Sequence, residues 1–134
     1  MSWNSLYETG VKELDCQNFD LLSRLDAMVD ADSLAVRVQQ LVHFEQVVTA
    51  YFEREQRMHG ECGYYDADIH KFAHRSYLEH LGRIKWRFTE GKFTLENELI
   101  FMKDAVGILL KHIMDEDKSF AGFYHENILR AKAQ

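Results

Sequence analysis

The stretch HKFAHRSYLEHLGRIKWRF, residues 70–88, decides the fold of this chain. Its apolar and histidine positions recur every three or four residues, which is the spacing of one buried stripe along an α-helix. That stripe consists of His70, His74, Tyr77, Leu81, Ile84 and Phe88. Because His70 and His74 lie one helical turn apart, both rings project from the same face. The stretch therefore predicts a core-facing helix that carries two potential metal ligands into the core.

Three further segments have the same spacing, and the chain contains no proline that would interrupt a helix. Their stripes are Asn18, Leu21, Leu25 and Met28; Leu41, Phe44, Val48, Tyr51, Glu55 and Met58; and Phe101, Ala105, Ile108 and His112, the last flanked by Leu99, Met102, Val106, Leu109 and Ile113. Turn-forming and capping residues separate the segments at 30–33, 60–63, Gly91 and Thr94. We therefore expect four amphipathic helices.

Four such helices with short polar connections predict an all-α protein, an antiparallel up-down-up-down four-helix bundle. The length of 134 residues and the hydrophobic content of 46% suit a single domain over residues 1–134. We expect an irregular N-terminal arm over residues 1–16 that carries Trp3 and Tyr7. The bundle should then span about 17–117, and a short C-terminal helix should span about 119–131.

The charge pattern argues against a nucleic-acid partner. The net charge is −6, and lysine and arginine are scattered among acids, whereas a nucleic-acid surface needs a clustered basic face. No apolar run approaches the ~20 residues that span a bilayer, and the first residues do not resemble a signal peptide. We expect a cytoplasmic protein with no membrane partner, in which Cys16 and Cys62 are reduced thiols.

Polar residues fall on the predicted core stripes, namely Glu55, His70, His74 and His112. An unpaired buried carboxylate costs on the order of several kcal/mol or gives up its charge, so Glu55 needs a partner. Each residue also has an ordinary explanation: a surface histidine pair, a hydrogen-bonded core histidine, or an ion pair with a neighbouring arginine. Together, on three helices, they favour a metal site.

An acidic residue should complete the site near His112. Asp117 lies five residues further on, about 140° around an ideal helix, so the two side chains converge only if the helix ends or distorts there. On an ideal helix Asp115 or Glu116 would be better placed. Helix geometry alone leaves this choice open.

Mixed imidazole and carboxylate ligands suit iron, manganese or zinc. The Glu-x-x-His spacing of ferritin-like carboxylate bundles occurs nowhere in the sequence, which excludes that class of dinuclear site. The other histidines, His43, His59, His80 and His125, are interpreted as surface or packing residues. His59 with Cys62 is a second candidate metal pair.

In these residues the chain resembles the hemerythrins, and more closely the bacterial hemerythrin-like proteins, from Trp3 to about Asp117. The resemblance rests on the order and spacing of Leu14-Asp15-Cys16-Gln17, residues 51–58, Gly63-Tyr64-Tyr65, His70-x-x-x-His74 and His112-Ile113-x-x-x-Asp117. It implies a non-haem diiron bundle that binds oxygen. His70, His74 and His112 would bind the first iron, and Glu55 and Asp117 would bridge the two irons. The family's His-x-x-x-x-Asp spacing is the reason to prefer Asp117 over Glu116.

The second iron site departs from the family pattern, because Asn18 and Tyr51 stand where its two histidines are expected. One hypothesis keeps two irons, with the Tyr51 phenolate and the Asn18 carbonyl oxygen as ligands. Another fills only the three-histidine site with iron or zinc, and a third makes the bundle a metal-free interaction module.

For function we expect carriage, storage or sensing of oxygen or a related small gas. The fourth-helix residues Ile108, Leu109 and Ile113 should form the apolar wall of the ligand pocket, as the resemblance implies. Redox chemistry toward peroxide or nitric oxide is the enzymatic alternative. No dedicated acid–base pair outside the ligand set supports catalysis.

Overall fold

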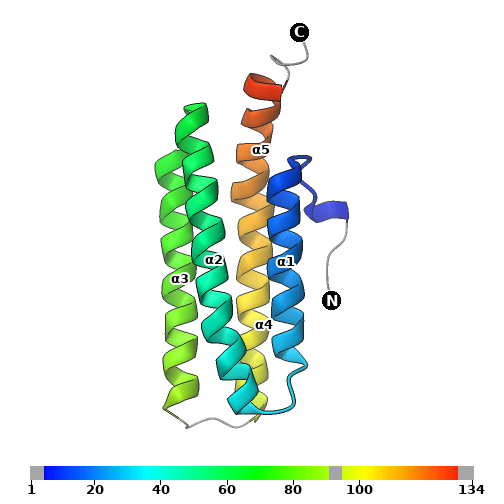
Figure 1. The fold of residues 1–134 in the computed structure, drawn as a ribbon, viewed down its shortest axis with the longest axis vertical. Coiled ribbons are helices and arrows are strands. Elements are labelled where there is room, and N and C mark those ends of the chain that lie inside the picture. Colours follow the sequence, from blue (N-terminus) through cyan, green and yellow to red (C-terminus); the bar gives the residue numbers. More distant parts are fainter. Residues whose placement is uncertain (1–4, 91–94, 130–134) are drawn as a thin grey trace.

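Four long antiparallel helices form the body of the protein (Figure 1). The computed structural model describes residues 5–90 and 95–129. The helices are α1 (Lys12–Val29), α2 (Leu34–Cys62), α3 (Ala67–Thr89) and α4 (Leu95–His112). Each packs against the next along the chain, and α4 packs back against α1. The predicted all-α up-down-up-down bundle is confirmed.

The connections on both sides of α2 follow the expected turn chemistry. The Ser33 side chain accepts a hydrogen bond from the Val36 N–H at 3.2 Å and caps the start of the helix. At the other end Gly63 has φ +67°, and the N–H of Tyr64 donates to the His59 carbonyl at 3.0 Å. Glycine adopts this left-handed conformation without steric cost, so α2 stops there. The residues expected to end α3 and to cap α4, Gly91 and Thr94, lie outside the described residues.

Helix α1 begins earlier than predicted. Among the described residues, a 3-10 turn at Ser5–Tyr7 and a short connection precede Lys12, so the expectation of an irregular arm through residue 16 is wrong for residues 12–16. The Asp15 carboxylate accepts hydrogen bonds from the Thr9 N–H and hydroxyl, both at 2.8 Å. A carboxylate in the first turn stabilises a helix start, and this contact anchors the connection. Trp3 lies outside the described residues.

The sequence predicted a separate C-terminal helix after the bundle. In the structure the fourth helix instead continues directly into the C-terminal segment. A π-helical segment, Ile113–Asp117, joins α4 directly to α5 (Lys118–Tyr124), and a second π-helical segment follows at His125–Leu129. In the first segment the Lys118 N–H donates to the Ile113 carbonyl, five residues back. The C-terminal helix is therefore an extension of α4 along the same axis (Figure 1).

The main apolar cluster runs along the bundle, and a smaller one surrounds Phe120 of α5. The burial of side chains in the main cluster corrects two predicted stripes. On α2 the buried positions after Val48 are Phe52, Glu55 and His59 rather than Tyr51 and Met58. On α4, Met102, Ala105 and Leu109 are buried, whereas Ile108 is 39% exposed. Both alternatives fit a 3.6-residue period, so only packing against the neighbouring helices distinguishes them. Within the described part of the chain, no helix is long and apolar enough to cross a bilayer.

A buried ion pair between Arg37 and Glu98 joins the first turns of α2 and α4. Arg37 is 2% exposed and Glu98 6%, and Nη1 of the arginine lies 3.1 Å from Oε1 of the glutamate. The same guanidinium donates to the Met28 and Ala31 carbonyls at 2.9 Å each. Arg37 thus connects α4 to the end of α1 and to the connection before α2.

Replacing this arginine should destabilise the fold strongly. Removing one partner of a buried pair leaves the other charge uncompensated, so Arg37→Met should lower the free energy of unfolding by about 3–5 kcal/mol. Urea denaturation measures the change. Arg24→Met is the matched control, because its ion pair with Asp20 is exposed and such pairs contribute about 0–1 kcal/mol. An equal loss of unfolding free energy in the two variants would contradict the stabilising role of the buried Arg37–Glu98 pair.

Candidate metal centre

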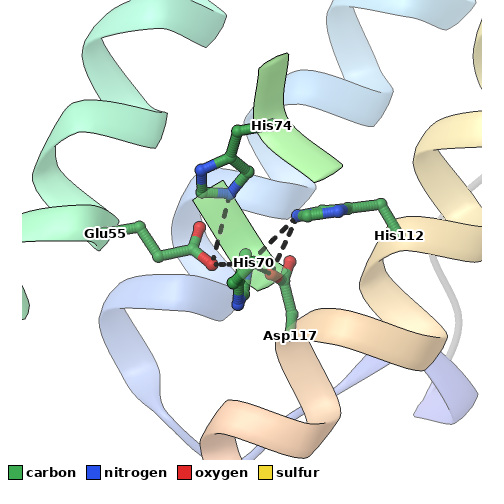
Figure 2. Close-up of side chains that lie close together, drawn as sticks. All are labelled: Glu55, His70, His74, His112 and Asp117. Atoms are coloured by element: carbon green, nitrogen blue, oxygen red, sulfur yellow. Dashed lines mark hydrogen bonds and ion pairs between the residues drawn. The ribbon is translucent and has the colours of Figure 1, made fainter. Parts of the chain in front are cut away.

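Five buried side chains from four helical segments meet inside the bundle (Figure 2). They are Glu55 from α2, His70 and His74 from α3, His112 from the end of α4, and Asp117 from the end of the π-helical segment. One donor atom from each lies within 4.8 Å of all the others. The structure therefore brings together all five residues that the sequence predicted as ligands, in an arrangement that could bind a metal ion.

The π-helical segment explains how His112 and Asp117 reach the same point. Residues five apart diverge on an α-helix, but a π-turn takes up the extra residue and returns both to one face. As a result His112 Nε2 lies 3.2 Å from Asp117 Oδ1. The distortion that the sequence required for this pair is present. Such π-turns occur frequently at functional sites.

His70 lies at the centre of the cluster. Its Nε2 is 2.7 Å from Glu55 Oε1, 3.0 Å from Asp117 Oδ1 and 3.3 Å from His112 Nε2. His74 Nε2 lies 3.7 Å from the same oxygen of Glu55. The two carboxylates thus face each other with three imidazole nitrogens between and around them.

Several of these donor atoms have no hydrogen-bond partner among the described residues. Glu55 Oε1, His74 Nε2 and Asp117 Oδ1 are fully buried, and the short contacts to the two oxygens lack hydrogen-bond geometry. Buried polar atoms are nearly always satisfied, so a group of unsatisfied atoms that converge on one point calls for a missing partner. A metal ion with imidazole and carboxylate ligands fits this set.

Neighbouring side chains hold His74 in place. Its Nδ1 lies 2.9 Å from Gln56 Oε1, which accepts a hydrogen bond from the Nδ1–H. In this tautomer the lone pair of Nε2 is directed at the cluster. The Phe52 ring stacks on the imidazole at 3.8 Å with an interplanar angle of 8°. A second partner that fixes the orientation and tautomer of an imidazole is typical of metal-ligating histidines.

The two carboxylates shift each other's pKa in opposite directions. Burial, together with the negative charge of Asp117, raises the pKa of Glu55 well above 4.5. Burial alone would also raise the pKa of Asp117, but the charge and contacts of His112 and His70 outweigh it and hold the pKa well below 3.8. Without a metal, one carboxylate therefore stays ionised and the other tends toward its neutral form.

The histidines shift as well. Burial would lower the pKa of His70, but its contacts with Asp117 and Glu55 outweigh this and raise the pKa from 6.5 to about 9. For His74 burial dominates, assisted by the charges of His112 and His70, and lowers the pKa to about 2. Without a metal, a protonated His70 takes the place of a cation between the carboxylates, and His74 is a neutral donor.

The two residues at the expected second iron site make other contacts. The Asn18 amide donates to Asp117 Oδ2 at 3.0 Å, so it touches the cluster from α1 as a hydrogen-bond donor. The Tyr51 hydroxyl donates to Asp20 Oδ2 at 2.7 Å, and this hydrogen bond is the main cause of its raised pKa. Tyr51 is only partly buried and packs beside Arg54.

His59, which the sequence analysis interpreted as a surface or packing residue, is buried beside the cluster. This residue is 1% exposed, with Nε2 3.8 Å from Glu55 Oε1. The signal was present as Glu55-x-x-x-His59, an i, i+4 pair on one helix face. The group of potential ligands among the described residues includes neither His59 nor Cys62, so that pair is not found as a site of its own.

The expected ligand wall is only partly enclosed. Leu109 and Ile113 are fully buried in the main core, but Ile108 lies at the surface. Its side chain lines a groove of about 340 Å³ between α3 and α4 that also reaches His112. A second groove, of about 240 Å³ between α1 and α2, reaches Glu55. The grooves therefore end at residues of the cluster, whose donor atoms are themselves buried.

Comparisons of the chain with family models, with curated proteins and with solved structures found no match. The fold and the site by themselves define an all-α four-helix protein with a buried His/Glu/Asp cluster that could bind a metal ion.

The pKa shifts predict that the metal-free fold is most stable near neutral pH. The pKa of His70 is raised to about 9, so its protonated ring contributes stability that is fully present below pH 6.5. This contribution is lost as the pH rises through about 9. The pKa of His74 is lowered to about 2, so this residue makes the fold less stable in acid. Below pH 6.5 the unfolded chain takes up a proton at His74 that the folded protein does not.

Urea midpoints of chelator-treated protein at pH 5, 7 and 9.5 measure both effects. Because His70 must lose its proton before the ring can bind a metal, metal affinity should rise with pH until His70 is deprotonated, near pH 9. His70→Gln should remove the alkaline loss of stability and leave the acidic one. An unchanged alkaline loss in this variant would contradict the role of His70.

Proposed function

We propose that this protein is a hemerythrin-like non-haem iron protein that binds oxygen or a related small gas. The observation that carries the proposal is the buried cluster of three histidines, one glutamate and one aspartate, whose unsatisfied donor atoms converge on one point. The order and spacing of these ligands along the chain agree with the resemblance. The ligand types suit iron, with manganese and zinc as competitors.

In this proposal each residue has a defined task. His70, His74 and His112 supply neutral nitrogen ligands, and Glu55 and Asp117 supply negative charge. Iron held by these residues would supply a redox-active centre that can bind a small gas. Apolar surroundings such as Phe52 keep bulk water away from it and slow oxidation of the iron.

The contacts of Asn18 and Tyr51 favour a site with one iron over a diiron site. The Asn18 amide already donates to Asp117, and the Tyr51 hydroxyl is bound to Asp20. A raised pKa also disfavours the phenolate that a tyrosine ligand requires. Sensing or storage of a gas therefore fits better than the reversible oxygen carriage of a ferrous pair.

Metal analysis tests the proposal directly. The purified protein should contain about one iron per chain, and iron should raise its melting temperature because a metal bound only by the folded state stabilises that state. Reduced protein should change its visible spectrum reversibly with oxygen or nitric oxide. His74→Ala should lower iron affinity at least about 10-fold. His80→Ala, a partly buried histidine on the same helix, is the control.

If iron, manganese and zinc all leave the melting temperature unchanged, the metal-free interaction module replaces this proposal. Rapid peroxide turnover by the iron-loaded protein, well above that of free iron, would instead place it among redox enzymes.

Tyr51→Phe distinguishes the one-iron from the two-iron form. If Tyr51 is bound to Asp20 and not to metal, the variant should have the same iron content and the same ferric visible spectrum as the wild type. A ligand phenolate would give the wild type a charge-transfer band in the visible that the variant lacks. Loss of such a band, with half of the iron, would show a second iron site.

A further inference from the structure

His59 is enclosed by aromatic rings at the edge of the cluster. It is 1% exposed, and its ring centroid lies 4.3 Å from those of His70 and Phe120 and 5.2 Å from that of Tyr64. The contact with Phe120 joins α2 to α5, beyond the π-helical segment. The position of this imidazole is therefore determined by packing from several elements.

Neither ring nitrogen of His59 has a hydrogen-bond partner among the described residues. An imidazole that only filled space here would leave two polar atoms unsatisfied, and each of them would lose its hydration without gaining a hydrogen bond. A leucine or phenylalanine would fill the same apolar volume without this cost. The polar ring therefore needs a partner that hydrogen bonds within the chain do not provide.

We propose that His59 is a further ligand of the metal centre and binds through Nε2 beside Glu55. This inference rests on the proposed function, since it requires a metal in the cluster. Its Nε2 lies 3.8 Å from Glu55 Oε1. Two donors with bonds of about 2.1 Å can share one ion up to a separation of about 4.2 Å, so the observed distance allows a common ion.

The helix geometry supports the same conclusion. Glu55 and His59 are one turn apart on α2, opposite His70 and His74, which are one turn apart on α3. Three imidazole Nε2 atoms, those of His59, His70 and His74, lie within 3.8 Å of Glu55 Oε1. The carboxylate oxygen is thus surrounded by nitrogen donors from both helices.

The consequence concerns the donors available beside Glu55. With His59, imidazole nitrogens from both α2 and α3 lie next to this carboxylate. A metal ion bound beside Glu55 would then have one more neutral nitrogen donor than the five-residue cluster supplies. The additional donor should tighten the binding of a metal such as zinc.

Zinc-loaded protein tests the assignment without relying on gas binding. X-ray absorption counts the imidazole ligands, and competition with a chromophoric chelator measures zinc affinity. We expect four imidazoles in the wild type and three in His59→Phe, which keeps the ring volume and removes both nitrogens. Zinc affinity should fall at least about 10-fold. His80→Phe is the matched control, because its Nε2 is also buried without a hydrogen-bond partner and lies outside the cluster.

The outcomes separate this inference from the proposed function. Wild type and His59→Phe with the same zinc affinity and the same three imidazoles would overturn it and leave the five-ligand site intact. A wild type that binds neither zinc nor iron would overturn both. Circular dichroism verifies folding, and if His59→Phe does not fold, His59→Leu is measured in the same way.

Discussion

Two buried carboxylates that share one small volume form the constraint on which the rest of this structure depends. Glu55 and Asp117 are both almost fully enclosed, and like charges this close in a medium of low polarity cannot both persist without a cation between them. A proton on His70 provides that positive charge in the absence of metal. A metal ion bound to the cluster, as proposed, would take the same position and would have to displace this proton.

The rest of the bundle keeps this arrangement in place. Apolar packing along four helices surrounds the cluster, and the Arg37–Glu98 pair closes the opposite end of the bundle. The π-helical segment after His112 shifts the register of the last helix so that Asp117 faces inward. The extra residue in this π-turn brings Asp117, rather than Asp115 or Glu116, into the cluster.

The side of the cluster that faces α1 differs chemically from the side near Phe120. Toward α1, Asn18 donates to Asp117 and Tyr51 donates to Asp20, so neutral amide and hydroxyl donors stand where the family resemblance places histidines. Toward Phe120, His59 brings an additional imidazole close to Glu55. The two sides therefore offer different chemistry to the two carboxylates, hydrogen-bond donors on one and an imidazole on the other.

The sequence by itself determined the fold class, the four helices and the Ser33 cap, because helical periodicity and capping are local properties. It also placed Glu55, His70, His74 and His112 on core stripes, whereas Asp117 followed from the family resemblance, because helix geometry left Asp115 and Glu116 open. Only the tertiary structure decided between Tyr51 and Phe52, or between Ile108 and Leu109, as the buried residue, since both choices fit the helical period. The burial of His59 and the π-turn depend in the same way on contacts with distant elements. Spacing alone cannot reveal what a neighbouring helix covers.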